Sequence, residues 1–246
     1  MKLNIGWLYP ELMSTYSDRG NIICLTKRCN WRGIKTEIIN IDKNSKSFGN
    51  IDLLFGGGAQ DRQQEIVTRD LIIKQKIINN LIENGLPGLF TCGSYQLMGH
   101  YYEPSLGKRI QGLGILDIVT IHPGLDTPRF IGNIIAEILT PDLKGSILIG
   151  FENHGGRTTL GKNAKPLAKV IKGYGNNGAD GFEGAVFKNI IGTYFHGPVL
   201  PKNPRLADHL IKLALEKKYK KLIELSKLDD SLENIAHDII MNKYGQ

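Results

Sequence analysis

Short apolar runs alternate with longer segments of helical spacing through the first part of the chain. Four of these runs have the length of buried strands: residues 3–9, 36–41, 51–55 and 86–91. A helix is expected from about Ile22, and a longer one over 64–84, where Gly85 follows as its C-cap. Strands that alternate with helices predict an α/β fold with a parallel sheet and crossover helices.

The pattern changes after Gly99. Three strand-like segments, separated by Gly, Pro and Asp, indicate an antiparallel excursion at residues 115–121, 130–138 and 147–151. Two more strands are expected at 185–188 and 190–194, and helices at 203–218 and 231–242. Asn203 has the residue type and the position of an N-cap for the first of these helices.

Composition narrows the class of protein. With 41% hydrophobic and 22% charged residues, the 246-residue chain can build a sizeable core. No apolar run has the length of a membrane span, and the first run lacks a signal-peptide cleavage pattern, so we expect a cytoplasmic protein. The net charge is +7, and much of the basic excess lies between Lys202 and Lys221, where lysines and Arg205 at helical spacing indicate a solvated helix face rather than a nucleic-acid site.

Cys92 is the cysteine with the strongest functional signal. The other two, Cys24 and Cys29, form no C-x-x-C pair with it or with each other, which argues against a disulfide framework and a zinc site. Cys92 follows the strand at 86–91 and precedes Gly93 and a short helical pattern. Many free cysteines are merely buried apolar residues, but a strand-to-helix elbow exposes its central side chain to backbone N–H groups that favour a thiolate. We therefore predict a nucleophile.

Three motifs fall where predicted strands end: Gly56-Gly57-Gly58, Cys92 and His196. The crevice beyond the carboxyl ends of the strands is the ligand site of open α/β sheets, so these motifs are expected to converge. A Cys–His pair supplies a nucleophile and a general acid/base, and a glycine turn supplies N–H groups for an oxyanion hole. The turn lacks the spacing of a nucleotide-binding loop. His154 is the alternative histidine, in a Gly-rich region expected to be a loop.

Seven motifs in a fixed order resemble one enzyme family. They lie at residues 9–13, 16–21, 55–61, 92–96, 127–133, 150–154 and 192–198. Over about residues 3–215 the chain resembles the class I glutamine amidotransferases, and more closely their cobyric-acid-synthase-like branch. The resemblance implies a flavodoxin-like three-layer fold, with a central, mostly parallel sheet flanked by helices. It also implies a single amidotransferase domain over 1–246, with C-terminal helices from about 203.

The resemblance also implies roles for individual residues. Cys92 would attack the side-chain carboxamide of L-glutamine, with His196 as general base, to give a thioester and ammonia. Gly58 and Gly93 would supply the oxyanion hole. Two residues are expected to bind the substrate: Arg129, through the α-carboxylate, and Gln96 in the same pocket. No metal ligand is implied.

The same resemblance extends to a partner. Within the branch, the chain looks most like glutaminase subunits that form a heterodimer with a Mur-ligase-like partner subunit. That partner would use ATP and Mg²⁺ to amidate D-glutamate in the stem peptide of lipid II, and this chain would hold no cofactor itself. Lipid II would bring the complex to the inner face of the membrane.

One position departs from the family pattern. Pro198 stands where most triad amidotransferases carry an acid, two residues after the histidine. Glu152 and Asp18 are the two alternatives for the third member, but the sequence places neither beside His196, so we expect the catalytic unit to be a Cys92–His196 dyad. Other functions also stay open: a glutaminase for another ATP-dependent amide synthetase, of corrinoid type, and a non-catalytic protein in which Cys92 is a redox sensor.

Overall fold

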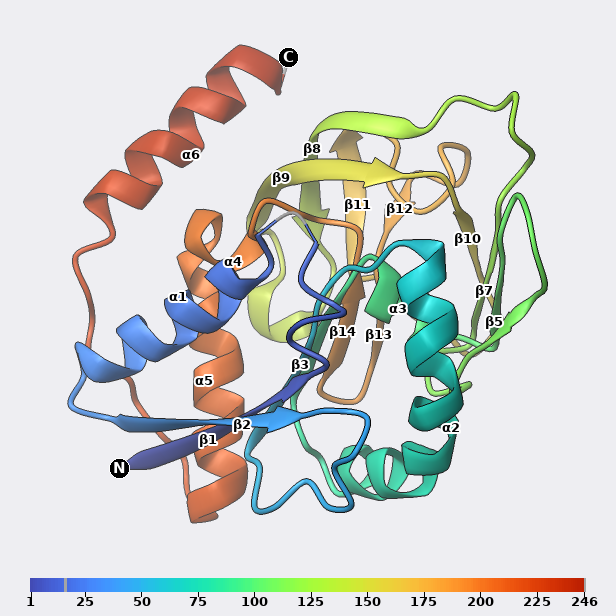
Figure 1. Cartoon of the computed structure of the whole chain (residues 1–246). Coiled ribbons are helices and arrows are strands. Elements are labelled where there is room, and N and C mark those ends of the chain that lie inside the picture. Colours follow the sequence, from blue (N-terminus) through green and yellow to red (C-terminus); the bar gives the residue numbers. More distant parts are fainter. Residues whose placement is uncertain (16, 246) are drawn as a thin grey trace.

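A six-stranded sheet forms the centre of the computed structural model, which describes residues 1–15 and 17–245 (Figure 1). Tyr16, in the second motif of the series, lies outside the described residues. In spatial order the strands are β13 (Ala185–Phe187), β14 (Ile190–Thr193), β4 (Gly88–Thr91), β3 (Leu53–Gly56), β1 (Lys2–Leu8) and β2 (Lys35–Ile41). Neighbours pair in parallel except β13 and β14. This confirms the prediction of an α/β fold with a mostly parallel sheet.

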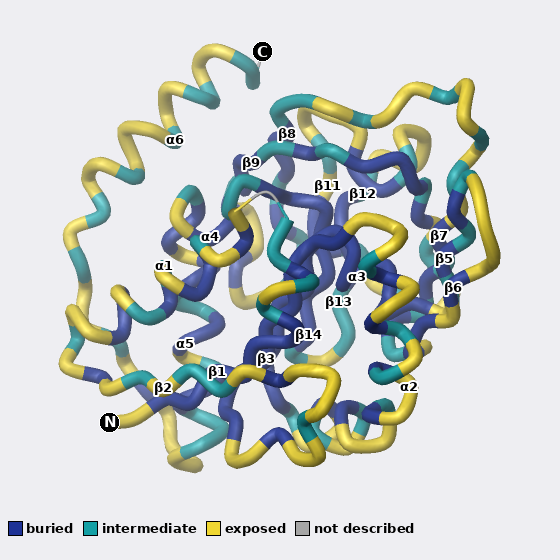
Figure 2. The backbone as a smooth tube through the Cα atoms, viewed as in Figure 1, coloured by how far each residue is buried: buried dark blue, intermediate teal, exposed yellow. Residues whose placement is uncertain are grey.

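Helices cover both faces of this sheet because its strands are apolar on both sides. Leu53 and Phe55 face one layer, and Leu54 between them faces the other. The first layer holds α1 (Arg19–Asn30), α4 (Val199–Lys202) and α5 (Pro204–Tyr219), and the second holds α2 (Asp61–Glu83) and α3 (Gly93–Met98). β3, β4 and β14 are buried throughout, and β1 is buried except at Lys2, whereas the edge strand β2 is largely accessible (Figure 2).

Two small sheets form the excursion between β4 and β14. One has the order β10 (Arg157–Leu160), β7 (Ile118–Ile121), β5 (Tyr101–Glu103) and β6 (Ile110–Gln111). The other has the order β12 (Phe182–Glu183), β11 (Ala168–Lys172), β8 (Phe130–Ile138) and β9 (Ile147–His154), and a 3-10 turn, η1 (Pro141–Leu143), joins β8 to β9. Pairing is antiparallel as expected except between β5 and β7, which run parallel. Strands of two to five residues are too short to show a period in the sequence.

One local prediction was wrong, and a second was confirmed in position only. His154 is the last residue of β9 and is buried, whereas the sequence placed it in a Gly-rich loop. Asn203 sits at the N-cap position of α5, but its side chain does not cap the helix. Its amide instead accepts from Ile149 N and donates to Ile149 O, at 2.9 Å each, so it joins α5 to β9. Both side chains make hydrogen bonds that local sequence patterns do not indicate.

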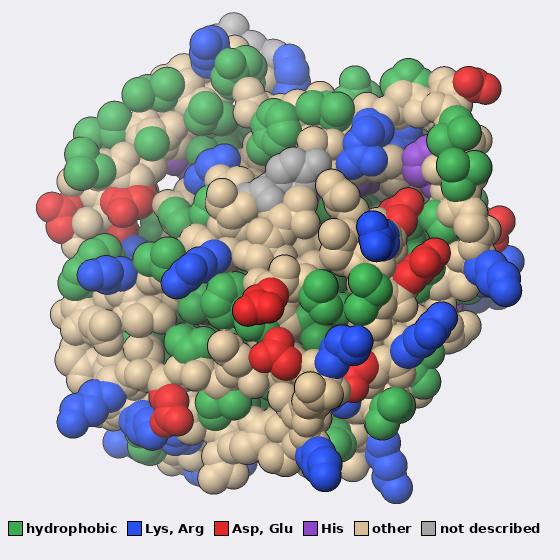
Figure 3. Space-filling model, viewed as in Figure 1, with side chains coloured by type: hydrophobic (Ala, Val, Ile, Leu, Met, Phe, Trp, Pro, Cys, Tyr) green, Lys and Arg blue, Asp and Glu red, His purple; other side chains and the backbone are tan. Residues whose placement is uncertain are grey.

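The last helix, α6 (Ser231–Tyr244), lies at the edge of the molecule and has no buried residue, and its His237 Nε2 lies 3.1 Å from Ile147 O of β9 (Figure 1). Figure 3 shows hydrophobic side chains along it, and among them Leu232 is 77% exposed. Arg28 of α1 reaches its N-cap residue, Asp230, at 2.6 Å. In the described part of the chain, no helix has both the length and the apolar character that crossing a membrane requires.

Candidate active site

Cys92 lies at the tight elbow between β4 and α3. Its φ of +49° is in the left-handed region, which a residue other than glycine occupies only when the surrounding structure holds it there. The N–H of Cys92 donates to Thr193 O of the neighbouring strand at 2.8 Å. A side chain on Gly93 would lie 2.7 Å from Ala59 N, so only glycine fits after the cysteine. Gly93 begins α3, and its N–H therefore has no partner within the helix.

The structure brings Gly58, Cys92 and His196 together. A methyl group placed on Gly58 would lie 3.0 Å from His196 Cε1 and 3.5 Å from Cys92 Cβ. His196 follows the end of β14, and its N–H donates to Phe151 O of β9 at 2.7 Å, which pins the histidine backbone. Three strand ends far apart in the sequence thus meet at one edge of the sheet.

Of the two acids considered from the sequence, Asp18 is the one beside His196. Asp18 Oδ1 lies 3.8 Å from His196 Nδ1, and its Oδ2 accepts from Gly58 N at 2.5 Å. Both side chains are buried. Glu152 instead accepts from Tyr174 N at 2.7 Å and from Gly175 N at 3.0 Å, so its carboxylate serves the backbone of another loop.

The pKa of His196 reflects its two neighbours. Burial by itself lowers this pKa, but the negative charges of Cys92 and Asp18 and the hydrogen bonds of both side chains with the ring raise it to about 10. His196 is therefore an imidazolium at neutral pH. Paired with a thiolate, it can give a proton to a leaving group and then take one from water.

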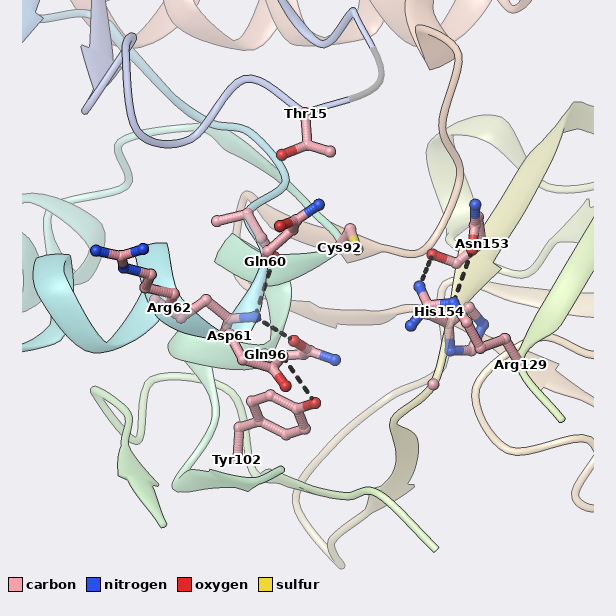
Figure 4. A pocket seen from close by; sticks show the side chains of 13 residues that line it. Thr15, Gln60, Asp61, Arg62, Cys92, Gln96, Tyr102, Arg129, Asn153 and His154 are labelled. Carbon is pink, nitrogen blue, oxygen red and sulfur yellow. Dashed lines mark hydrogen bonds between the residues drawn. The ribbon is translucent and has the colours of Figure 1, made fainter. Parts of the chain in front are cut away.

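A cavity of about 490 Å³ opens beside Cys92 (Figure 4). Arg129 and Gln96 line it, as does His154, whereas His196 does not line it and is 1% exposed. The Arg129 guanidinium donates to Asn153 Oδ1 and to Asn153 O, at 3.0 Å each, so its side chain is held in place at the cavity wall. A fixed guanidinium is well suited to binding a carboxylate.

Gln96 belongs to a buried polar wall of the cavity. Its Oε1 accepts from Gln64 Nε2 at 2.9 Å, and its Nε2 donates to Tyr194 OH at 3.2 Å. The Tyr194 ring stacks on His154, with ring centroids 3.6 Å apart. The imidazole of His154 is fixed as well, because its Nδ1 lies 2.8 Å from Gly156 O. Burial lowers the pKa of His154, which keeps this ring neutral at pH 7.

Sequence reasoning missed several of these residues. Gln64 had a detectable signal, since it occupies an apolar-face position of α2, in register with Val67 and Leu71. Asn153 lay inside a quoted motif without an assigned role. Glu183, which accepts from Tyr194 N at 3.0 Å, had no signal in the sequence because its position carries neither a motif nor a period.

Comparison with protein families gives one match over most of the chain. The CobB/CobQ-like glutamine amidotransferase domain matches residues 4–204. Solved structures agree at the level of the fold. The PurLQS structure from Thermotoga maritima superimposes with a TM-score of 0.58 at 15% identity, covering 90% of this chain and 100% of that one. A glutamine amidotransferase from the same organism gives a TM-score of 0.53 at 15% identity, covering 98% and 97%.

Curated relatives are more similar in sequence. The lipid II isoglutaminyl synthase (glutamine-hydrolyzing) subunit GatD of Streptococcus pneumoniae is 41% identical over 240 residues, covering 96% of this chain and 90% of the relative. The subunit of the same name from Staphylococcus aureus is 38% identical over 243 residues, covering 98% and 96%. The cobyric acid synthase of Pelotomaculum thermopropionicum is 29% identical, and the match covers 85% of this chain but 39% of that enzyme.

Proposed function

The chain belongs to the CobB/CobQ-like glutamine amidotransferase family, and we propose that it is the glutamine-hydrolysing subunit of a lipid II isoglutaminyl synthase. The observation that carries this proposal is the convergence of Cys92, His196 and Asp18 beside a cavity that Arg129 lines. The share of each relative that this chain matches favours a GatD-like subunit over a cobyric acid synthase. The chain spans at least nine-tenths of each GatD subunit, but well under half of the cobyric acid synthase.

The first half of the reaction releases ammonia. Arg129 binds the α-carboxylate of L-glutamine, which places the side-chain carboxamide at Cys92. The Cys92 thiolate attacks the carbonyl carbon, and the tetrahedral oxyanion accepts a hydrogen bond from the Gly93 N–H. When the C–N bond breaks, the His196 imidazolium gives its proton to the departing nitrogen. The products are ammonia and a γ-glutamyl thioester on Cys92.

The second half regenerates the enzyme. His196, now neutral, takes a proton from a water molecule as that water attacks the thioester. The C–S bond breaks, glutamate leaves, and Cys92 returns to the thiolate beside a protonated His196. Each proton that His196 gives in the first half is thus recovered in the second.

Asp18 acts as the third member of this unit. Its Oδ1 faces His196 Nδ1 and orients the ring toward Cys92, the task that an acid performs in a catalytic triad. Its Oδ2 accepts from Gly58 N, the second expected oxyanion donor. For Gly58 to serve the oxyanion as well, its N–H must be shared between the two acceptors or turn from Asp18 as the negative charge develops.

The ammonia goes to a Mur-ligase-like partner subunit, which activates the D-glutamate α-carboxylate of lipid II with ATP and Mg²⁺. Support comes from the GatD relatives, whose name describes a subunit of lipid II isoglutaminyl synthase. The complex then works at the inner face of the membrane, where lipid II is the acceptor. This chain contributes the glutaminase reaction and needs no cofactor for it.

Glutamate release from L-glutamine tests the proposal, with the full chain assayed alone and together with a Mur-ligase-like candidate subunit. We expect release that depends on Cys92, and Cys92→Ala should lower it by about 10⁴-fold or more, because no other group can form the thioester. The fold of the variant is checked by circular dichroism. A folded wild-type protein that releases no glutamate in either condition contradicts the proposal.

A further inference from the structure

Glu183 is a buried carboxylate that the reaction described above does not use. It ends β12, in the sheet formed by β8, β9, β11 and β12, and its exposure is 0%. Two donors reach the same oxygen, Oε1: the Thr193 hydroxyl and, at 3.0 Å, Tyr194 N. A carboxyl group from the small sheet is therefore inserted at the end of β14, a strand of the central sheet.

The backbone that Glu183 holds connects the two reacting residues. Thr193 O accepts the Cys92 N–H at 2.8 Å, so Thr193 is bound directly to the elbow. The β14 strand ends at Thr193, and Tyr194 N has therefore left the ladder of the central sheet. Glu183 takes the place of the missing strand partner. His196 follows two residues later.

We propose that Glu183 is a positioning residue that holds the Thr193–Tyr194 peptide, and through it the placement of His196 relative to Cys92. The inference rests on the proposed glutaminase function. It assigns a catalytic purpose to the second small sheet, which both pins His196 N through Phe151 O and braces the preceding peptide through Glu183.

Glutamine is a close structural match for a protonated Glu183, so a Glu183→Gln substitution can test the proposal. Burial raises its pKa to about 7, against the lowering effect of the hydrogen bonds from Thr193 and Tyr194, and nearby Glu152 adds to the rise. Glutamine copies the shape of the neutral carboxyl and keeps the Oε1 acceptor. Leucine keeps the approximate volume and removes the acceptor, so the two substitutions separate hydrogen bonding from packing.

The experiment measures kcat and KM for glutamine in the full chain carrying Glu183→Leu or Glu183→Gln. We expect Glu183→Leu to lower kcat by about 10-fold to 100-fold, since a small misplacement of reacting groups costs that much, with KM within about twofold. Glu183→Gln should recover kcat to within about threefold of the wild type. Leu210→Ala, a core truncation on α5 away from the cavity, serves as the control that lowers Tm without lowering kcat.

A folded Glu183→Leu variant with wild-type kcat overturns the inference, and so does a loss that Glu183→Gln fails to restore. If Glu183→Leu does not fold, Thr193→Val removes the hydroxyl donor instead, and an unchanged kcat there overturns it equally. The rate at which iodoacetamide alkylates Cys92 gives a readout that needs no glutamine. Alkylation slowed by Glu183→Leu but not by Glu183→Gln supports the inference even where glutaminase activity is absent, which would count against the proposed function alone.

Discussion

Two buried histidines belong to the candidate site, and their surroundings shift their pKa values in opposite directions. His196 and His154 each follow or end a strand, and their exposures are 1% and 2%. Each has a carboxylate nearby, with Asp18 at 3.8 Å from the first and Glu152 at 3.7 Å from the second. Yet the pKa of His196 is raised to about 10, while that of His154 is lowered.

The difference comes from what else each ring and each carboxylate contacts. His196 has the charge of Cys92 as well as that of Asp18, and together these outweigh the cost of burial. For His154, burial outweighs the raising effect of Glu152, a carboxylate that two backbone N–H groups also bind, and the charge of Arg157 lowers the pKa further. A nearby acid therefore does not by itself make a histidine basic. In the proposed reaction, the site divides into a reacting side with Cys92, His196 and Asp18, and a binding side with Arg129, Asn153 and His154.

Replacing each histidine separately should give the largest effect and test whether the two rings have different roles. His196→Ala removes the proton donor and acceptor, and we expect kcat to fall by about 10³-fold or more. His154→Ala removes a wall residue and should cost less than about 10-fold in kcat. Steady-state glutamate release measures both. Equal losses in kcat would mean that the two sides are not functionally distinct.

Asp18→Asn should weaken the reacting side without removing it. The substitution keeps the size of the side chain but removes the charge that stabilises the imidazolium, so kcat should fall by about 10-fold to 100-fold with little change in KM. The pKa of His196 should fall below the value of about 10, which NMR titration of the ring measures. An unchanged His196 titration would show that Cys92 alone sets its charge.

Arg129→Ala tests the binding side. Loss of a charge-assisted pair with the α-carboxylate should raise KM for glutamine by about 10-fold to 100-fold, while kcat stays within a few-fold. Arg62, an exposed arginine that also lines the cavity, is the matched control, and Arg62→Ala should change KM by less. If the two variants have the same KM, the α-carboxylate is bound elsewhere.

The smallest expected effect is on the free energy of unfolding. Its dependence on pH has opposite directions for the two histidines. A lowered pKa means that the His154 contribution is present above its unfolded value of 6.5 and is lost as the pH falls through the folded-state value. The raised pKa of His196 means that its contribution is present below 6.5 and is lost as the pH rises through about 10. Urea unfolding at pH 5 and 7 should therefore show a smaller acid loss in His154→Phe than in the wild type. An identical acid loss would show that His154 does not titrate in this range.

The long elements and the elbow were predictable because their signals are local. The apolar period of α2, the strand-length runs of the central sheet and the Cys92-Gly93 turn all follow from neighbouring residues. The convergence of the glycine turn with Cys92 and His196 followed from one topological rule, that parallel strands end at a common edge. The short strands did not follow, since two to five residues carry no period. The extension of β9 to His154 did not follow either, because the end of that strand is polar and runs into glycines.

From the sequence follow the nucleophile Cys92, the histidine His196 and the glycine turn, together with the edge of the sheet at which they meet. The tertiary structure alone decided which acid faces His196, since the sequence left Asp18 and Glu152 equal. It also decided that Glu183 holds the peptide between Cys92 and His196. Hydrogen bonds from distant loops made both choices, and a carboxylate bound by a distant backbone leaves no pattern in its own neighbours along the chain.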